Sequence, residues 1–125
     1  MQLDAIGIVV TDLARAVPFY RLLGLAFPDP GADDHIEATT ASGLRVMLDS
    51  EQLVRGLSDG WVEPRGQRVG LAWKCASPAE VDARYHAIVA AGFDGATPPW
   101  DAFWGQRYAQ VRDPDGTKVD LFAPL

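Results

Sequence analysis

The chain has a single cysteine, Cys75, among its 125 residues. No disulfide can form within the chain, which excludes a small extracellular fold held together by disulfides. Cys75 ends the apolar run VGLAWKC, and a lone cysteine in such a run is typically a small buried side chain. The simplest compartment for such a chain is the reducing cytoplasm.

Long apolar runs are also missing. A membrane-spanning helix needs about 20 mostly apolar residues, and the apolar runs in this sequence are much shorter. The N-terminal segment MQLDAIGIVV carries an acidic residue and no basic stretch, so we expect no secretory signal. We therefore predict no membrane partner.

Positive charge is scarce. Lysine and arginine total 11 against 17 aspartates and glutamates, and the formal net charge is −6. This balance repels a polyphosphate backbone, and the basic residues are scattered rather than gathered in a stripe. The composition therefore argues against nucleic acid and against an anionic membrane surface as partners.

The remaining composition is that of a globular protein. The chain is 48% hydrophobic and 22% charged, which excludes a disordered protein. Its length allows one domain with one hydrophobic core, and we predict a single domain over residues 1–125.

The first half of the chain shows the pattern strand, helix, strands. Apolar residues at helical spacing follow the first strand, and Gly24 is positioned to end the helix. Pro18 is tolerable there if it lies in the first helical turn, where backbone donors have no partner in any case. The predicted strands cover residues 4–10, 35–40 and 44–48, and an irregular stretch covers 51–65.

The second half repeats this order. Ser77 and Pro78 open a helix as its N-cap and first residue, and Gly92 ends it. The Pro98-Pro99 pair indicates a loop. The sequence Asp-Pro-Asp-Gly at 113–116 strongly predicts a turn between two strands. The predicted strands cover residues 68–75, 107–112 and 118–122.

The two halves place glycines at matching points, Gly24 with Gly92 and Gly43 with Gly116, about 70 residues apart. This repeat predicts an α+β fold of two βαβββ modules that form a curled mixed sheet around a cleft, with the helices outside. Module one covers about residues 3–50, a linker about 51–66, and module two about 67–125.

Two segments, IGIVVTDLARAVPFYRLLGL and DPDGTKVDLF, resemble the vicinal oxygen chelate superfamily of glyoxalase I, extradiol dioxygenases, fosfomycin-modifying enzymes and bleomycin-resistance proteins. The stretch PPWDAFWGQRYAQVRDPDGTKVDLFAPL is similar to the mitomycin-binding resistance proteins. Those proteins hold a drug between aromatic side chains without altering it. The resemblance also implies a homodimer.

The resemblance implies four metal-ligand positions, and they fall at Ala5, Met47, Gly70 and Asp120. Only Asp120 has a carboxylate, whereas even an open catalytic site needs about three protein donors. We therefore predict no catalytic metal and no cofactor, and we assign no catalytic residue. Of the two histidines, His86 is expected to be solvated on its helix.

Aromatic side chains gather near the C-terminus. Trp104 stands just before Gly105 and a strand, so we predict that it stacks on a ligand at the rim of the cleft. For Trp100 and Phe103, ligand contact and core packing both remain open. Trp61, between the modules, either covers the mouth of the cleft, as a lid or dimer contact, or anchors the linker.

Strand alternation selects the other candidates. If Ala5 and Asp120 face inward, Gly7, Ala72, Lys74, Lys118 and Phe122 do so too. Asp49, Gln110 and Asp120 would then orient the polar edges of a ligand. Alternatively, they are solvated strand ends or form salt bridges with Arg45 and Lys118. His35 is either in the pocket or at a strand edge. The predicted ligand contacts are Trp104, Trp100, Phe103, Tyr108, Met47, Asp49, Gln110, Asp120, Trp61 and His35.

These observations predict metal-independent binding and sequestration of a planar aromatic small molecule, for example an antibiotic. The alternative is a glyoxalase-type lyase or isomerase that depends on a metal or uses Asp120 as a general base. A third possibility is an accessory module whose aromatic cluster contacts another protein.

Overall fold

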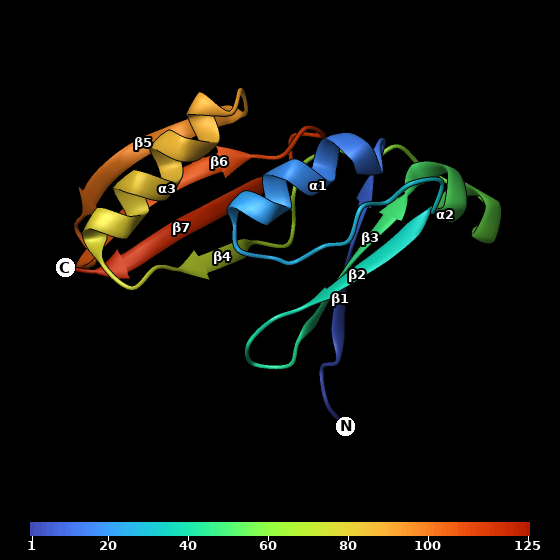
Figure 1. Cartoon of the computed structure of the whole chain (residues 1–125), viewed down its shortest axis with the longest axis horizontal. Coiled ribbons are helices and arrows are strands. Elements are labelled where there is room, and N and C mark those ends of the chain that lie inside the picture. The colour runs from blue at the N-terminus through green and yellow to red at the C-terminus, as the bar shows by residue number, and fades with distance from the viewer. The chain divides into compact units, whose positions relative to one another are not determined.

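The computed structural model describes all residues from 1 to 125, and it confirms an α+β fold with three helices and seven strands (Figure 1). The chain divides into two compact units, residues 1–63 and 64–125. The boundary falls inside the segment predicted to link two modules. No helix has the length and apolar character needed to cross a membrane.

The first unit contains a three-stranded mixed sheet. The central strand β3 runs parallel to β1 and antiparallel to β2. The elements in chain order are β1 (Ala5–Val10), α1 (Leu13–Leu22), β2 (His35–Thr39), β3 (Arg45–Ser50) and α2 (Glu51–Leu57).

Side chains alternate between the two faces of this sheet. One face is buried and supplies Ile8, Val10, Ile36, Ala38, Val46 and Leu48 to the core. Burial of one such aliphatic side chain contributes about 1.5–3 kcal/mol. The opposite face carries Ala5, Gly7, Val9, His35, Glu37, Thr39, Arg45, Met47 and Asp49, which the strand register aligns.

Two strands follow α1 at the predicted places, one fewer than follow α3 in the second unit. Two expectations for the first unit were wrong in detail. The helix begins at Leu13 with Asp12 as its N-cap, so Pro18 lies in the second turn. The stretch after β3 is helical at Glu51–Leu57, since the Ser50 hydroxyl accepts a hydrogen bond from the Leu53 amide at 3.0 Å.

The second unit contains a four-stranded sheet in the order β4-β7-β6-β5. Strand β4 runs parallel to β7, and the other neighbours are antiparallel. The elements are β4 (Leu71–Lys74), α3 (Pro78–Ala90), β5 (Asp94–Ala102), β6 (Gln106–Arg112) and β7 (Lys118–Pro124).

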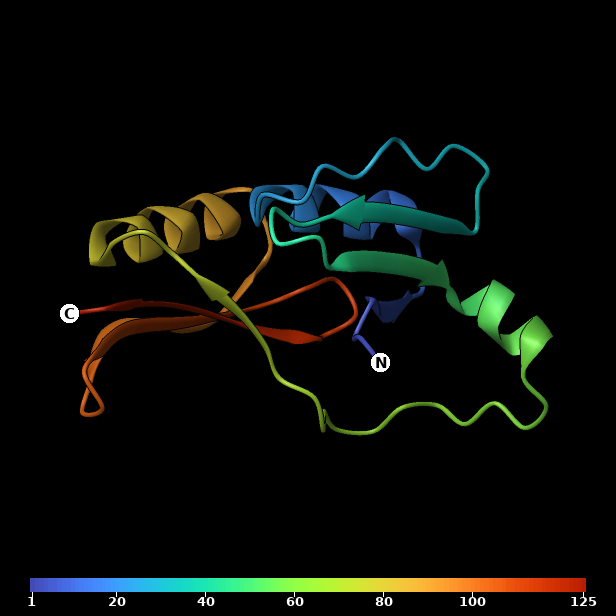
Figure 2. The same cartoon turned by 90° about the horizontal axis from the view of Figure 1, so that it is seen from below.

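Helix α3 covers one face of this sheet (Figure 2). Its buried residues are Val81, Tyr85 and Ile88. The strands β6 and β7 bury Ala109, Val111, Val119, Leu121 and Ala123, which alternate with half-buried side chains. The other face carries no helix of this unit, so it is the open face of the sheet.

The Pro98-Pro99 pair lies within strand β5 and not in the predicted loop. β5 is the edge strand, where a residue without an N–H group interrupts no ladder on the outer side. The pairing with β6 shifts register on either side of Thr97, which accommodates the prolines. Trp100, which follows the prolines in this irregular edge strand, is again paired with β6.

Gly24 and Gly92 follow the ends of α1 and α3 with φ of 89° and 94°. L-amino acids with a side chain rarely adopt this conformation, which explains glycine at both positions. The prediction that these two glycines end the helices is confirmed.

Gly95 brings β5 close to α3. A Cβ atom at this position would collide with the Tyr85 hydroxyl group and the Val89 side chain. We expect Gly95→Ala to lower the free energy of unfolding by about 1–3 kcal/mol, the usual effect of overpacking. Gly56→Ala, in α2 where nothing lies near the added methyl group, should have no destabilising effect. Thermal unfolding of both variants measures this; equal melting temperatures would contradict the close approach.

Candidate functional site

The open face of the second unit carries the strand positions that the sequence predicted to lie together. Asp120 is in register with Gln110 on β6 and with Ala72 on β4. Phe122 is in register with Tyr108 and with Lys74. The predicted shared face of these residues is confirmed.

Four aromatic side chains form a continuous cluster on this face, which we call the aromatic cluster: Trp100, Phe103, Trp104 and Tyr108. Trp100 and Tyr108 are cross-strand partners. Trp104 contacts the other three rings, with centroids 5.0–5.3 Å apart and interplanar angles of 82–88°. Edge-to-face contacts of this kind stabilise aromatic pairs beyond their burial.

The hairpin between β5 and β6 positions Trp104. The turn at residues 103–105 ends in Gly105, whose φ is 87° and whose amide donates to the Ala102 carbonyl at 2.9 Å. The Trp104 indole N–H donates to Gln106 Oε1 at 2.8 Å. Trp104 retains 47% of its accessible surface and Phe103 93%. The turn therefore holds Trp104 in a fixed position with an accessible ring.

A chain of polar groups lies next to the cluster. The Thr97 hydroxyl donates to Gln110 Oε1 at 3.0 Å, and Gln110 Nε2 donates to Asp120 Oδ1 at 2.8 Å. Burial, together with the neighbouring Asp120 carboxylate, raises the pKa of Tyr108 to about 12. The phenol is neutral at physiological pH. The observed partners of Asp120 are Gln110 and Tyr108, and not Lys118 as in the alternative salt bridge.

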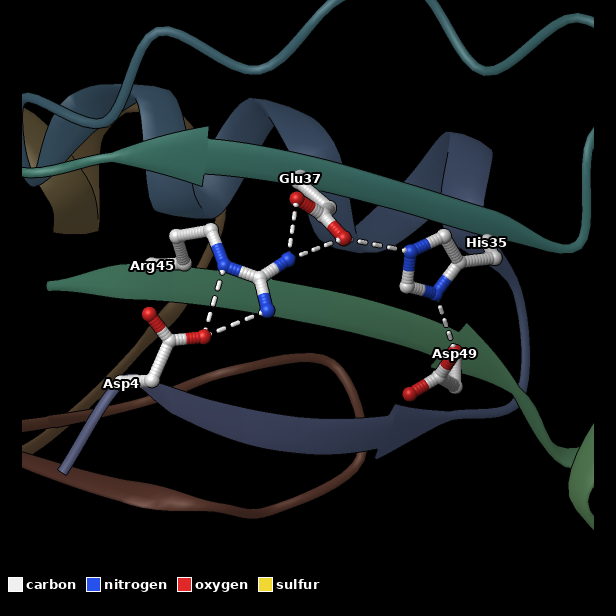
Figure 3. A network of polar contacts seen from close by, with 5 residues as sticks. All are labelled: Asp4, His35, Glu37, Arg45 and Asp49. Atoms are coloured by element: carbon white, nitrogen blue, oxygen red, sulfur yellow. Dashed lines mark hydrogen bonds and ion pairs between the residues drawn. The ribbon is translucent and has the colours of Figure 1, made fainter. Parts of the chain in front are cut away.

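The open face of the first unit is ionic (Figure 3). Arg45 donates to both Glu37 oxygens at 2.7 Å and to Asp4 Oδ2 at 2.6 Å. His35 lies between two carboxylates, with Nδ1 2.6 Å from Asp49 and Nε2 2.9 Å from Glu37. We call these five residues the ionic network.

The network corrects one expectation. Asp49 pairs with His35 and not with Arg45, whose partners are Glu37 and Asp4. The reason is strand register, because His35 lies directly opposite Asp49.

Hydrogen bonds set the protonation of the ionic network. The Asp49 carboxylate and then that of Glu37 raise the pKa of His35 above its usual value. Arg45 and then His35 lower the pKa of Glu37. When the imidazole carries both ring protons it can donate to Asp49 and Glu37, and the network then joins two cations to three carboxylates.

The four positions at which the resemblance implies metal ligands do not have the side chains to bind a metal. Ala5 and Gly70 offer no donor atom and Met47 offers a thioether, a poor ligand for hard or borderline divalent ions. The remaining carboxylate, that of Asp120, accepts from Gln110. No group of three or more His, Cys, Asp or Glu side chains is placed to hold a metal ion.

Cys75, His86 and Trp61, which were singled out from the sequence, and the nearby Arg107 have structural contacts. Cys75 is buried, and His86 is exposed on α3, where it hydrogen-bonds the Asp82 carbonyl. Arg107 forms ion pairs with Asp82 and Asp101. Trp61 packs beneath the Arg55 guanidinium, 5.5 Å from its ring centroid. The ligand-contact role predicted for Trp61 stays a prediction.

Sequence reasoning missed three polar residues beside the predicted site on the second unit. Thr97 fixes the Gln110 amide, while Gln67 and Arg68 line a pocket together with Asp120. The signal was weak: Gln67 directly precedes the predicted strand, Arg68 is its first residue, and Thr97 precedes the proline pair.

The fold and the paired strand-helix-strand order are those of a two-module α+β protein of the glyoxalase type. Residues 2–121 match the Glyoxalase/Bleomycin resistance protein/Dioxygenase superfamily, and the chain belongs to this family. No curated protein matches the chain.

Solved structures share this fold. A glyoxalase/bleomycin resistance protein/dioxygenase from Nocardioides is 28% identical, with a TM-score of 0.76 over 100% of this chain and 84% of the other. A hypothetical protein from S. aureus is 20% identical (TM-score 0.83, 98% and 94% covered). A glyoxalase-related enzyme from Fulvimarina pelagi is 22% identical (TM-score 0.82, 98% and 87% covered).

The raised pKa of His35 gives a pH-dependent stability. Protonated His35 stabilises the first unit fully below the unfolded-state pKa of about 6.5, and this contribution is lost as the pH rises through the folded-state pKa. We expect NMR titration to place the pKa of His35 above 6.5 and Asp49→Asn to lower it. A pKa at or below 6.5 would show that the two carboxylates do not act on the ring.

Proposed function

We propose that this protein binds and sequesters a planar aromatic small molecule on the aromatic cluster, without a metal and without changing the ligand. The observation that carries this proposal is the group of four contacting rings on the open face of the second unit. Trp100 and Trp104 are 39% and 47% exposed. The edge-to-face contacts fix both indole rings while leaving them exposed, so a further aromatic ring can stack on them.

The energies are sufficient for binding. Each aromatic contact adds about 0.5–1.5 kcal/mol beyond burial of apolar area. Two such contacts plus burial of one ring system reach about −8 kcal/mol, which corresponds to a micromolar dissociation constant. The ligand requires no covalent or metal bond.

The polar chain supports an oriented ligand. Gln110 donates to Asp120, and each also shares a hydrogen bond with the Tyr108 hydroxyl group; a carboxylate has about four acceptor sites, so Asp120 can accept from a ligand as well. Both lie on the same strand face as Tyr108. A ligand with polar groups along one edge gains hydrogen bonds there in addition to ring contacts. Met47, Asp49, His35 and Trp61 belong to the first unit, and the ligand-contact role predicted for each of them stays a prediction.

The proposed biological role is drug resistance of the mitomycin-binding type, in a homodimer. The segment WGQRYA, which resembles such proteins, contains Trp104 and Tyr108 of the aromatic cluster. The family description includes bleomycin resistance proteins, and so does the description of the Nocardioides relative.

The competing function is a lyase or isomerase of the glyoxalase type that uses Asp120 as a general base or binds a metal. Elemental analysis of protein purified without chelators tests the metal-dependent form of this competing function, and an assay for chemical change of the bound ligand tests the form that uses Asp120 as a base. We expect less than a tenth of an equivalent of any divalent metal, because the donor set is incomplete. A near-equimolar divalent ion would contradict metal-independent binding.

Loss of the Trp104 ring should weaken ligand binding. We expect planar antibiotics to quench tryptophan fluorescence saturably, and Trp104→Ala to weaken binding by about 1–3 kcal/mol through lost stacking and burial. The matched control is Trp73→Phe, since Trp73 is in register with the buried Leu121 and lies on the other face. Unchanged affinity in Trp104→Ala would refute the stacking role.

A further inference from the structure

The second unit contains a pocket of about 200 Å³ beside the first residue of β7. Its lining includes the cations Arg68 and Lys118 and the carboxylate of Asp120. Two positive charges against one negative charge leave a net charge of +1. This is a local excess of positive charge in a chain whose formal net charge is −6.

Neither cation has a carboxylate partner. Six other arginines form ion pairs: Arg21, Arg45, Arg55, Arg84, Arg107 and Arg112. Arg68 and Lys118 form none, although acidic side chains outnumber basic ones. Asp120, in the same pocket, accepts a hydrogen bond from Gln110. The two cations are therefore available to a bound anion.

The wall of the pocket is fixed by the Gln67 side chain. Gln67 Oε1 accepts from the Lys118 amide at 2.7 Å, and Nε2 donates to the Lys118 carbonyl at 2.9 Å and the Val69 carbonyl at 2.6 Å. The amide thus bonds both backbone groups of Lys118, as a neighbouring strand would. It holds residues 67–70 against β7 ahead of the first regular pair of β4.

The pocket is open and lies along the same face as the aromatic cluster. A Cβ atom added to Gly70 would meet nothing within 4 Å, so the backbone of this wall leaves free space. Gln110 lines the pocket and lies two residues from Tyr108 on the same face of β6. Two residues of a strand span about 7 Å. A ligand of three fused rings can therefore cover both regions.

We propose that this pocket binds the carboxylate of a planar aromatic acid whose rings lie on the aromatic cluster. The inference rests on the proposed function and narrows the ligand to aromatic carboxylic acids. Arg68 and Lys118 hold the carboxylate by charge-assisted hydrogen bonds. Asp120 repels the carboxylate towards the two cations, and it accepts a hydrogen bond from any hydroxyl group on the adjoining ring.

The test compares two probes of equal shape, anthraquinone-2-carboxylate and anthraquinone-2-carboxamide, by fluorescence titration or calorimetry. We expect the acid to bind about tenfold more tightly than the carboxamide, because hydrogen bonds to a charged group are stronger than those to a neutral group. Lys118→Gln and Arg68→Gln should each remove most of this preference and leave the affinity for the carboxamide unchanged. Added salt should weaken binding of the acid alone.

Two controls keep the result interpretable. Lys74→Gln removes the chain's other lysine, which is in register with Phe122 outside the pocket, and it should keep the preference for the acid. Lys118→Gln should fold normally, because Gln67 bonds the Lys118 backbone and not its side chain. Melting temperature checks this.

The outcomes separate the two proposals. If both probes bind equally well and Trp104→Ala weakens both, the carboxylate pocket is refuted while aromatic binding stands. If neither probe binds, both proposals are refuted for this class of ring system. If Lys74→Gln lowers the acid preference as much as Lys118→Gln, the preference comes from the general charge of the face, and the pocket is again refuted.

Discussion

The structure of the second unit depends on one constraint, the packing of α3 against only one face of a four-stranded sheet. Because strand side chains alternate, burial of Val111, Val119 and Leu121 beneath α3 places their neighbours in sequence on the opposite face. Tyr108, Gln110, Asp120 and Phe122 are consequently collected there by register. A shift of one residue would bury the polar chain and expose the core.

The same rule in the first unit produces a face of a different character. Its open face holds the ionic network, where carboxylates flank both His35 and Arg45 and occupy their hydrogen-bonding groups. Such a network is internally satisfied and leaves little capacity for a ligand charge. The second unit has the reverse arrangement, with exposed rings and two cations without partners. The second unit therefore has the side chains that a ligand can engage.

Local patterns predicted much of this fold. Helix α3 has the expected Ser77 cap, with Glu80 N 3.2 Å from its hydroxyl, and the turn before β7 is organised by buried Asp113. Face-sharing along β6 and β7 follows from alternation alone. Strand β5 was missed because Pro98 and Pro99 are compatible with a strand only at a sheet edge, and edge position is a property of the whole sheet. The Gln67–Lys118 contacts were missed because they join residues 51 positions apart through a side chain, which no periodicity encodes.

The central claim, that ligands bind to the open face of the second unit, is tested most directly by chemical-shift mapping with anthraquinone-2-carboxylate. The account predicts saturable shifts at the Trp100 and Trp104 indole N–H groups and along β6, β7 and residues 67–70. The outward side of α3 and the ionic network should remain unchanged. Shifts confined to α3 or to the ionic network, with the two indole signals unmoved, would contradict the account.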